Sequence, residues 1–294
     1  MASISRFFSL TKAVELERPQ LELSGPILAG AFETLIAATD AQGGIEQWIA
    51  ALKLRQLMFS QALDPIAASG DTADLPLETF KSLCAFMASV RRRVAPWLEQ
   101  PHWDHLANAI AVLLQGAKDT STTDRRLAMF CSHFPADGGH RWVRDLGADL
   151  LHGLDPERYP LMCRWVWDRK ANSGVIREIW FDNEVDNITI DVADGYGTYI
   201  MLREELSQFL TENGVFRDVI WYVDLLSARI YASYIASQGG VYLRADFSAP
   251  DDPMAFARRM LGLDGVRAGS GRTRLKTIDG DAFVLSDEGT YAHS

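Results

Sequence analysis

The sequence predicts an α+β fold that is predominantly helical, with a helical N-terminal region followed by a small antiparallel sheet with helices. In residues 1–153, apolar side chains recur at the 3.6-residue period of an α-helix. After residue 153, short runs rich in tryptophan and β-branched residues appear, as is typical of strands. Near the end of the chain, Asp279-Gly280 separates two alternating apolar runs, which predicts a tight β-hairpin.

Short polar stretches divide the helical region. Pro26 occupies a first-turn position, where its missing N–H is tolerated. Asp64-Pro65 is expected to end the second helix, because proline disrupts a helix interior. Arg91–Arg93 are expected in the last turn of the third helix, where cations interact favourably with the dipole. The expected helices span residues 26–39, 45–63, 76–95, 102–116, 122–131 and 140–153.

The C-terminal region is expected to mix strands and helices. The runs 163–168 and 174–182 are joined by a glycine-containing polar loop, which favours a hairpin. A helix over 160–171 is the alternative, since Leu161 and Trp165 form an i,i+4 pair. The other expected elements are strands at 187–192 and 241–247, helices at 198–212, 216–236 and 252–261, and the hairpin at 275–285.

The change of pattern near residue 153 predicts two regions, 1–153 and 154–294, and the alternative is one continuous globular unit. Trp165 and Trp167 share one face of the expected hairpin, and Trp180 lies on the return strand. Large flat side chains suit the contact between a sheet and a helical layer. We therefore expect an aromatic seam between the two regions.

Composition narrows the class of protein. Of 294 residues, 48% are hydrophobic and 23% charged, which is typical of a folded chain without long disordered tracts. No apolar run is long enough for a membrane-spanning helix, and the first residues lack the pattern of a signal peptide. Three widely spaced cysteines favour neither a disulfide framework nor a thiolate zinc site. We expect a protein of the bacterial cytoplasm.

The net charge of −10 argues against nucleic-acid binding, since proteins that neutralise phosphates normally show a basic surplus. The only basic clusters in the helical region are Arg91–Arg93 and Arg125–Arg126. They would have to carry any contact with nucleic acid.

Candidate binding residues cluster just after the midpoint of the chain. Tryptophan, tyrosine and arginine are the side chains that dominate protein interfaces. A partner-binding surface would use Arg158, Tyr159, Trp165, Trp167 and Trp180. A second candidate is the glycine-bracketed basic loop near the end of the chain, whose backbone and guanidinium groups suit an anion. Its cationic side chains are Arg267, Arg272, Arg274 and Lys276.

Metal-dependent chemistry has two candidate groups. Asp182, Glu184 and Asp191 lie in an acidic run that could hold Mg²⁺ for phosphoryl chemistry, but the run 182–194 lacks the lysine that such sites usually add. A solvated strand edge, protected by charge from pairing, explains the same run. His102 and His105 could share a helix face as zinc or iron ligands, although their spacing matches no strict ligand pattern.

No common nucleophile, nucleotide-binding or dinucleotide-binding motif occurs in the sequence. We therefore expect a non-catalytic accessory or regulatory protein that acts through contacts with a partner protein or with itself, and that needs no cofactor. The alternative is a hydrolase of phosphate esters or nucleic acid that depends on a divalent metal ion.

Overall fold

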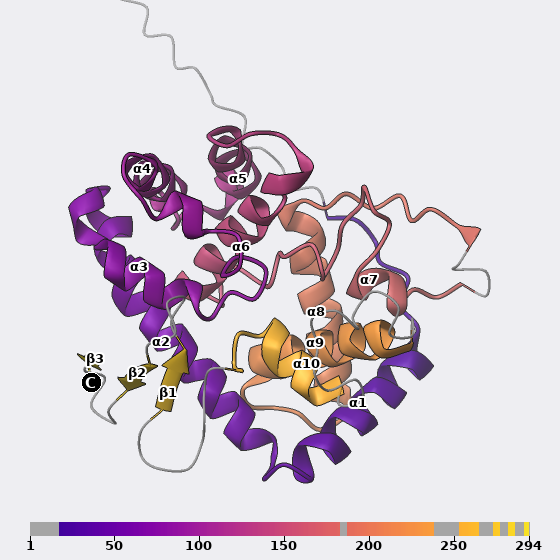
Figure 1. Cartoon of the computed structure of the whole chain (residues 1–294). Coiled ribbons are helices and arrows are strands. Elements are labelled where there is room, and N and C mark those ends of the chain that lie inside the picture. Colours follow the sequence, from indigo (N-terminus) through magenta and orange to yellow (C-terminus); the bar gives the residue numbers. More distant parts are fainter. Residues whose placement is uncertain are drawn as a thin grey trace, which may run out of the picture.

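The computed structural model describes residues 18–182, 187–237 and 253–264, together with the backbone of three short strands between residues 273 and 293. Helices dominate it (Figure 1). The helices are α1 Gly25–Asp40, α2 Ile45–Ser69, α3 Leu77–Cys84, α4 His102–Leu114, α5 Thr123–Ser132, α6 Trp142–Leu154, α7 Val175–Glu178, α8 Tyr196–Glu212, α9 Val219–Ser237 and α10 Pro253–Met260. Four short 3₁₀ helices occupy Thr72–Asp74, Ala95–Trp97, Thr120–Thr122 and Gly138–His140.

The helices of residues 18–153 agree with the ranges expected from the spacing of apolar residues, with two differences. Helix α2 continues through Pro65 to Ser69, because Ile66 is fully buried and keeps the last turns packed on the core. Helix α3 ends at Cys84, and the chain continues through tight turns. Arg91 is consequently not in a helix end, and it forms a bidentate ion pair with Asp264 at 2.8 and 2.6 Å.

The predicted fold class is wrong, because the described core is helical and no sheet forms among the described residues between 163 and 192. The chain does reverse direction there, through a single antiparallel bridge between Asp168 and Ser173. The carbonyl groups of Trp165 and Val166, which a strand would present to a neighbouring strand, accept the N–H groups of Val175 and Ile176 at the start of α7. Residues 160–181 are therefore neither the hairpin nor the long helix that the sequence allowed.

The expected strand at 187–192 does not form, and this segment has no strand neighbour among the described residues. Asn172 takes the place of that neighbour. Its side-chain amide donates to the carbonyl oxygen of Ile188 at 2.9 Å and accepts from the N–H of Ile190 at 3.1 Å. A side chain thus provides the hydrogen bonds that a ladder would have supplied.

The only strands assigned in the described part lie near the end of the chain. They are β1 Thr273–Lys276, β2 Ala282–Leu285 and β3 Tyr291–His293, and they pair antiparallel in the order β1-β2-β3. In the register, Lys276 lies opposite Ala282. The expected strand at 241–247 lies outside the described residues.

Helix α6 lies at the centre of the fold (Figure 1). It packs against α2, α4 and α5, and all its residues except Arg144 and Leu154 are buried. One cluster of buried hydrophobic side chains extends from Leu21 to Leu263. The predicted boundary between two regions falls at the end of α6 and stays a prediction.

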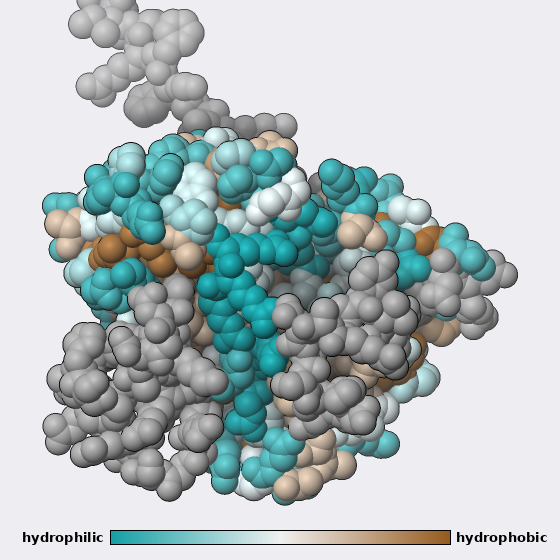
Figure 2. Space-filling view, viewed as in Figure 1, coloured by the Kyte–Doolittle hydropathy of each residue, from teal (hydrophilic) through white to brown (hydrophobic). Residues whose placement is uncertain are grey.

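The surface is largely polar on the face shown in Figure 2, where hydrophobic residues form only small patches. Six large hydrophobic side chains are exposed among the described residues: Ile27, Leu57, Val112, Met129, Phe181 and Phe216. A helix was expected to begin at Phe216, but α9 begins only at Val219. Within the described residues, no helix combines the length and the apolar character needed to cross a bilayer.

Candidate functional site

The buried helix α6 carries three ionisable side chains along one face. Asp145, Asp149 and His152 follow one another at i, i+4 and i+7, so they lie in a row on the same side of the helix. All three are buried. Buried ionisable groups are costly unless they are paired, so their partners decide whether this row is structural or functional.

Each of the three has a partner from another part of the chain. Asp145 accepts from the backbone N–H of Arg164 at 2.9 Å and from its guanidinium at 2.7 Å. Asp149 accepts from Arg55 of α2 at 3.3 Å. Burial raises the pKa of Asp149 to about 6, and the nearby Arg55 charge only partly offsets that effect.

His152 is held between two oxygen atoms. Its Nδ1 lies 2.8 Å from the carbonyl oxygen of Tyr159, and its Nε2 lies 3.2 Å from Oδ2 of Asp224 on α9. A carbonyl oxygen can only accept, so Nδ1 is the donor in the contact with Tyr159. The three ionisable side chains of α6 therefore connect this helix to α2, to α9 and to the segment after α6.

The N-terminal end of α6 opens into a cleft of about 520 Å³, which we call the Arg141 cleft. Its lining residues are Ala136, Asp137, Gly138, Arg141, Arg144, Arg164, Asp168, Lys170, Ala171 and Asp194. Arg141 donates to Asp168 at 2.7 Å. Arg144 donates to the carbonyl oxygens of Met162 at 2.9 Å and of Asp194 at 2.6 Å.

A second cavity, of about 580 Å³, lies at the C-terminal end of α6, and we call it the Tyr159 cavity. Its lining residues are Asp64, Ala67, Ala68, Leu114, Gly116, Ala117, Lys118, Leu154, Asp155, Arg158 and Tyr159. The last turns of α2, α4 and α6 all contribute to this lining.

Tyr159 fixes one wall of this cavity. Its hydroxyl donates to the carbonyl oxygen of Ala117 and accepts from the guanidinium of Arg126 at 2.7 Å. Arg158 at the rim pairs with Asp155. Asp64 and Lys118 make no hydrogen bond or ion pair with any other described residue. Their charged groups are therefore the ones available to a ligand.

The structure brings two of the five predicted partner-binding residues to a cavity, and they are Arg158 and Tyr159. Trp165 and Trp167 are buried in the core, where the indole of Trp167 donates to the carbonyl oxygen of Val192 at 3.0 Å. Trp180 is partly buried, and its backbone forms a bridge with Leu23. The three tryptophans therefore do not form one exposed surface.

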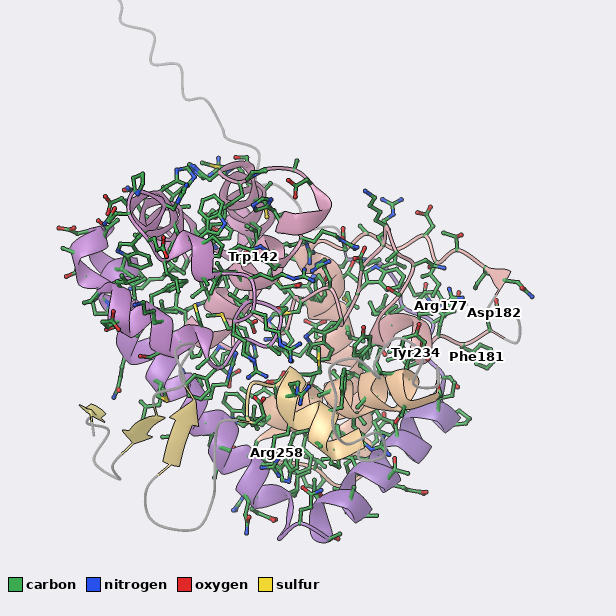
Figure 3. All side chains as sticks on the ribbon, viewed as in Figure 1. Trp142, Arg177, Phe181, Asp182, Tyr234 and Arg258 are labelled. Carbon is green, nitrogen blue, oxygen red and sulfur yellow. The ribbon has the colours of Figure 1, made fainter. Side chains whose placement is uncertain are left out.

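The candidate metal ligands do not form one group in the described part of the chain. Asp182 lies at the outer edge of the molecule in Figure 3, on the opposite side of the view from α4, the helix that begins at His102. Asp191 is exposed and pairs with Arg169 at 2.6 Å, and Glu184 lies outside the described residues. No group of three or more histidine, cysteine or acidic side chains in the described residues could hold a metal ion.

His102 and His105 pack instead against an aromatic ring. Their ring centroids lie 5.5 and 5.9 Å from that of Trp97. Nε2 of His105 also lies 2.7 Å from the carbonyl oxygen of His133. That contact occupies one of the two ring nitrogens of His105 that could bind a metal ion.

The basic candidates have mixed outcomes. Arg267 and Arg272 lie outside the described residues, and Arg274 and Lys276 belong to β1, of which only the backbone is described. In the two basic clusters of the helical region, Arg91 is paired with Asp264, and Arg126 is buried against Tyr159.

The Arg141 cleft was not predicted from the sequence. Its charged residues come from the loop before α6, the first turn of α6, the turn at 164–171 and the loop before α8. Only Arg141 and Arg144, three residues apart, carry a local signal, since that spacing places both on one side of a helix turn. Nothing in the sequence connects them to the turn at 164–171.

No family model, no curated protein and no solved structure matches this chain. The function is therefore inferred from the chemistry of its own side chains, at the two openings that lie at either end of α6.

Proposed function

We propose that the protein is a non-catalytic accessory protein of the cytoplasm that binds a basic segment of a partner protein, and that the Tyr159 cavity receives a cationic side chain of that segment. The observation that carries this proposal is the position of Arg158 and Tyr159. These two predicted partner-binding residues line a cavity at which three helices end.

The size and lining of the cavity suit a side chain with an apolar stem and a polar tip. Binding pockets in proteins have volumes of roughly 300–1,000 Å³ and combine apolar walls with a few polar groups. The Tyr159 cavity, at about 580 Å³, has an apolar wall formed by Ala67, Leu114, Ala117 and Leu154. The methylene stem of an arginine or lysine packs well against such a wall.

The electrostatics of the cavity favour a cation at that tip. Its lining contains two acidic and two basic side chains, which balance each other. The C-terminal ends of α2, α4 and α6 add negative potential to the cavity, because each helix C-terminus carries roughly half a negative charge. Asp64 then offers a carboxylate that is not engaged with any other described residue.

The charge of the whole chain acts in the same direction. A net charge of −10 attracts basic partners over longer distances and accelerates their encounter with the protein.

The test measures binding of a short peptide with blocked ends and the sequence Gly-Arg-Gly to the full chain by calorimetry. We expect saturable binding that is lost when glutamine replaces the arginine of the peptide. Asp64→Asn should weaken binding by about threefold, the value expected for one exposed charge pair. Ala68→Phe should abolish binding because the new ring fills the cavity.

The matched control is Asp40→Asn, which removes an exposed carboxylate at the end of α1, outside the cavity lining. It should leave the affinity unchanged. Absence of saturable binding, or equal loss of affinity in Asp64→Asn and Asp40→Asn, would show that the cavity does not recognise a cationic side chain.

A further inference from the structure

We propose that the Arg141 cleft is a second binding site, and that it takes the phosphate group of a small phosphorylated molecule. The proposal is independent of the Tyr159 cavity, since the two openings share no lining residue. It rests on unused hydrogen-bond donors, on the fixed positions of Arg144 and Arg164 and on the helix end that the cleft adjoins.

Three cationic side chains of the cleft have N–H groups to spare. Arg141 uses only one terminal nitrogen, in its contact with Asp168, and Nε of Arg164 is buried without a hydrogen-bond partner. Lys170 is exposed and makes no hydrogen bond or ion pair with another described residue. Donors from three separate positions suit a tetrahedral oxyanion, whose oxygens point in several directions.

The wall behind these donors is rigid. Two carbonyl oxygens hold the guanidinium of Arg144, and Asp145 holds both the backbone and the side chain of Arg164. Binding therefore orders few side chains, which reduces its entropic cost.

The start of α6 adds to the attraction for an anion. No side chain caps this end of the helix. Asp137 accepts instead from the N–H groups of Gly139 and His140, in the short 3₁₀ helix before α6. An uncapped N-terminus favours negative charge within its first turn, where Asp145 supplies one carboxylate that is already engaged by Arg164.

The three acidic side chains of the cleft, Asp137, Asp168 and Asp194, do not occupy these donors fully, and Asp137 is engaged with the short 3₁₀ helix before α6. Asp168 also accepts from the N–H of Ala171 at 3.0 Å, so it keeps a partner when Arg141 turns towards a ligand. Asp194 lies 3.8 Å from Arg144, at the outer limit of an ion pair. A dianionic phosphate competes with these carboxylates better than a singly charged carboxylate ligand does. The cleft volume of about 520 Å³ leaves room for the molecule that bears the phosphate.

The experiment titrates the full chain with inorganic phosphate, and separately with phosphoserine and with acetate, by calorimetry. We expect saturable binding of phosphate and phosphoserine and none of acetate. Amide signals of Gly138 and Ala171 in NMR spectra should shift in proportion to occupancy. Tight binding of acetate with no preference for phosphate would overturn the assignment in favour of a carboxylate site.

Lys170→Gln and Arg141→Gln should each weaken phosphate binding by about tenfold, as expected for a lost charge-assisted hydrogen bond. Both side chains are substantially exposed, so these variants should fold, and their circular dichroism checks this. The matched control is Arg169→Gln, which removes the cation next to Lys170 that pairs with Asp191 outside the cleft lining. If Arg169→Gln weakens binding as much as Lys170→Gln does, or if no saturable binding occurs, the proposed site is wrong.

Discussion

Asp149 lies in an environment that differs strongly from water. It is buried on α6, and its one charged partner in hydrogen-bond range among the described residues is Arg55 at 3.3 Å. Because burial penalises the charged form, the pKa of Asp149 is raised to about 6 in the folded chain, from an ordinary value of 3.8. The folded state therefore binds this proton more tightly than the unfolded state does.

The raised pKa of Asp149 predicts a specific pH dependence of stability. The contribution of Asp149 is fully present below pH 3.8 and is lost as the pH rises through about 6. A difference of this size between the folded and unfolded pKa values corresponds to a loss of about 3 kcal/mol. Asp149→Asn should remove this component, so the free energy of unfolding, measured by urea denaturation between pH 4 and 7, should decline less with pH than in the unmodified chain. Asp40→Asn is the control, and equal slopes for all three chains would contradict the prediction.

Single residues also explain why the sheet was predicted wrongly. Trp165, Trp167 and Val192 have the side chains of strands, and the sequence records those preferences correctly. Their carbonyl oxygens, however, accept from an N–H at the start of α7, from the hydroxyl of Tyr199 and from the indole N–H of Trp167, respectively. In each case a donor from elsewhere in the chain bonds a carbonyl oxygen that a neighbouring strand would otherwise have bonded. These contacts join positions far apart in the sequence, so the local pattern of apolar residues does not predict them.

Among the elements, α6 depends on a close approach to α2. A Cβ atom added at Gly153 would lie 2.2 Å from Cδ1 of Phe59, a fully buried ring. Neither helix can move away easily, because α6 is buried on nearly all sides.

Gly153→Ala should therefore destabilise the protein by about 2 kcal/mol, as overpacking does. The control is Gly30→Ala in α1, where an added Cβ meets nothing within 4 Å. That change should stabilise the protein by about 0.5–1 kcal/mol, because alanine favours a helix more than glycine does. The two changes in the free energy of unfolding, measured by denaturant titration, should have opposite signs, and a stabilising Gly153→Ala would show that α2 and α6 do not pack this closely.

The helices other than α7 were predictable, because apolar side chains recur along them at the 3.6-residue period of an α-helix. The residues at which the helices end were harder to predict. Pro65 remains inside α2 because the burial of Ile66 outweighs the lost hydrogen bond. Tertiary packing decides such cases, and the local sequence does not contain it.

At the scale of the whole molecule, both candidate openings are assembled from segments distant in sequence. Arg158 and Tyr159 were singled out by composition alone, whereas Asp64 and Lys118, which complete the same cavity, carry no pattern. The two openings lie at opposite ends of α6, and this arrangement can be seen only in the folded structure.

The overall charge gives a prediction at this scale. If the net charge of −10 assists the encounter with basic partners, raising NaCl from about 0.05 to about 0.5 M should weaken binding of the arginine peptide by about tenfold, since added salt screens exposed charges. The change should appear mainly in the association rate, measured by stopped-flow fluorescence. An association rate that is independent of salt would contradict a role for the global charge.

The length of α6 limits what any one compound can do. Its 13 residues separate the two openings by about 20 Å through the protein interior. A metabolite-sized molecule cannot reach from one to the other, so two such ligands would not compete by overlap. A bivalent inhibitor would need a flexible tether that runs around the outside of the protein and is therefore longer than the helix.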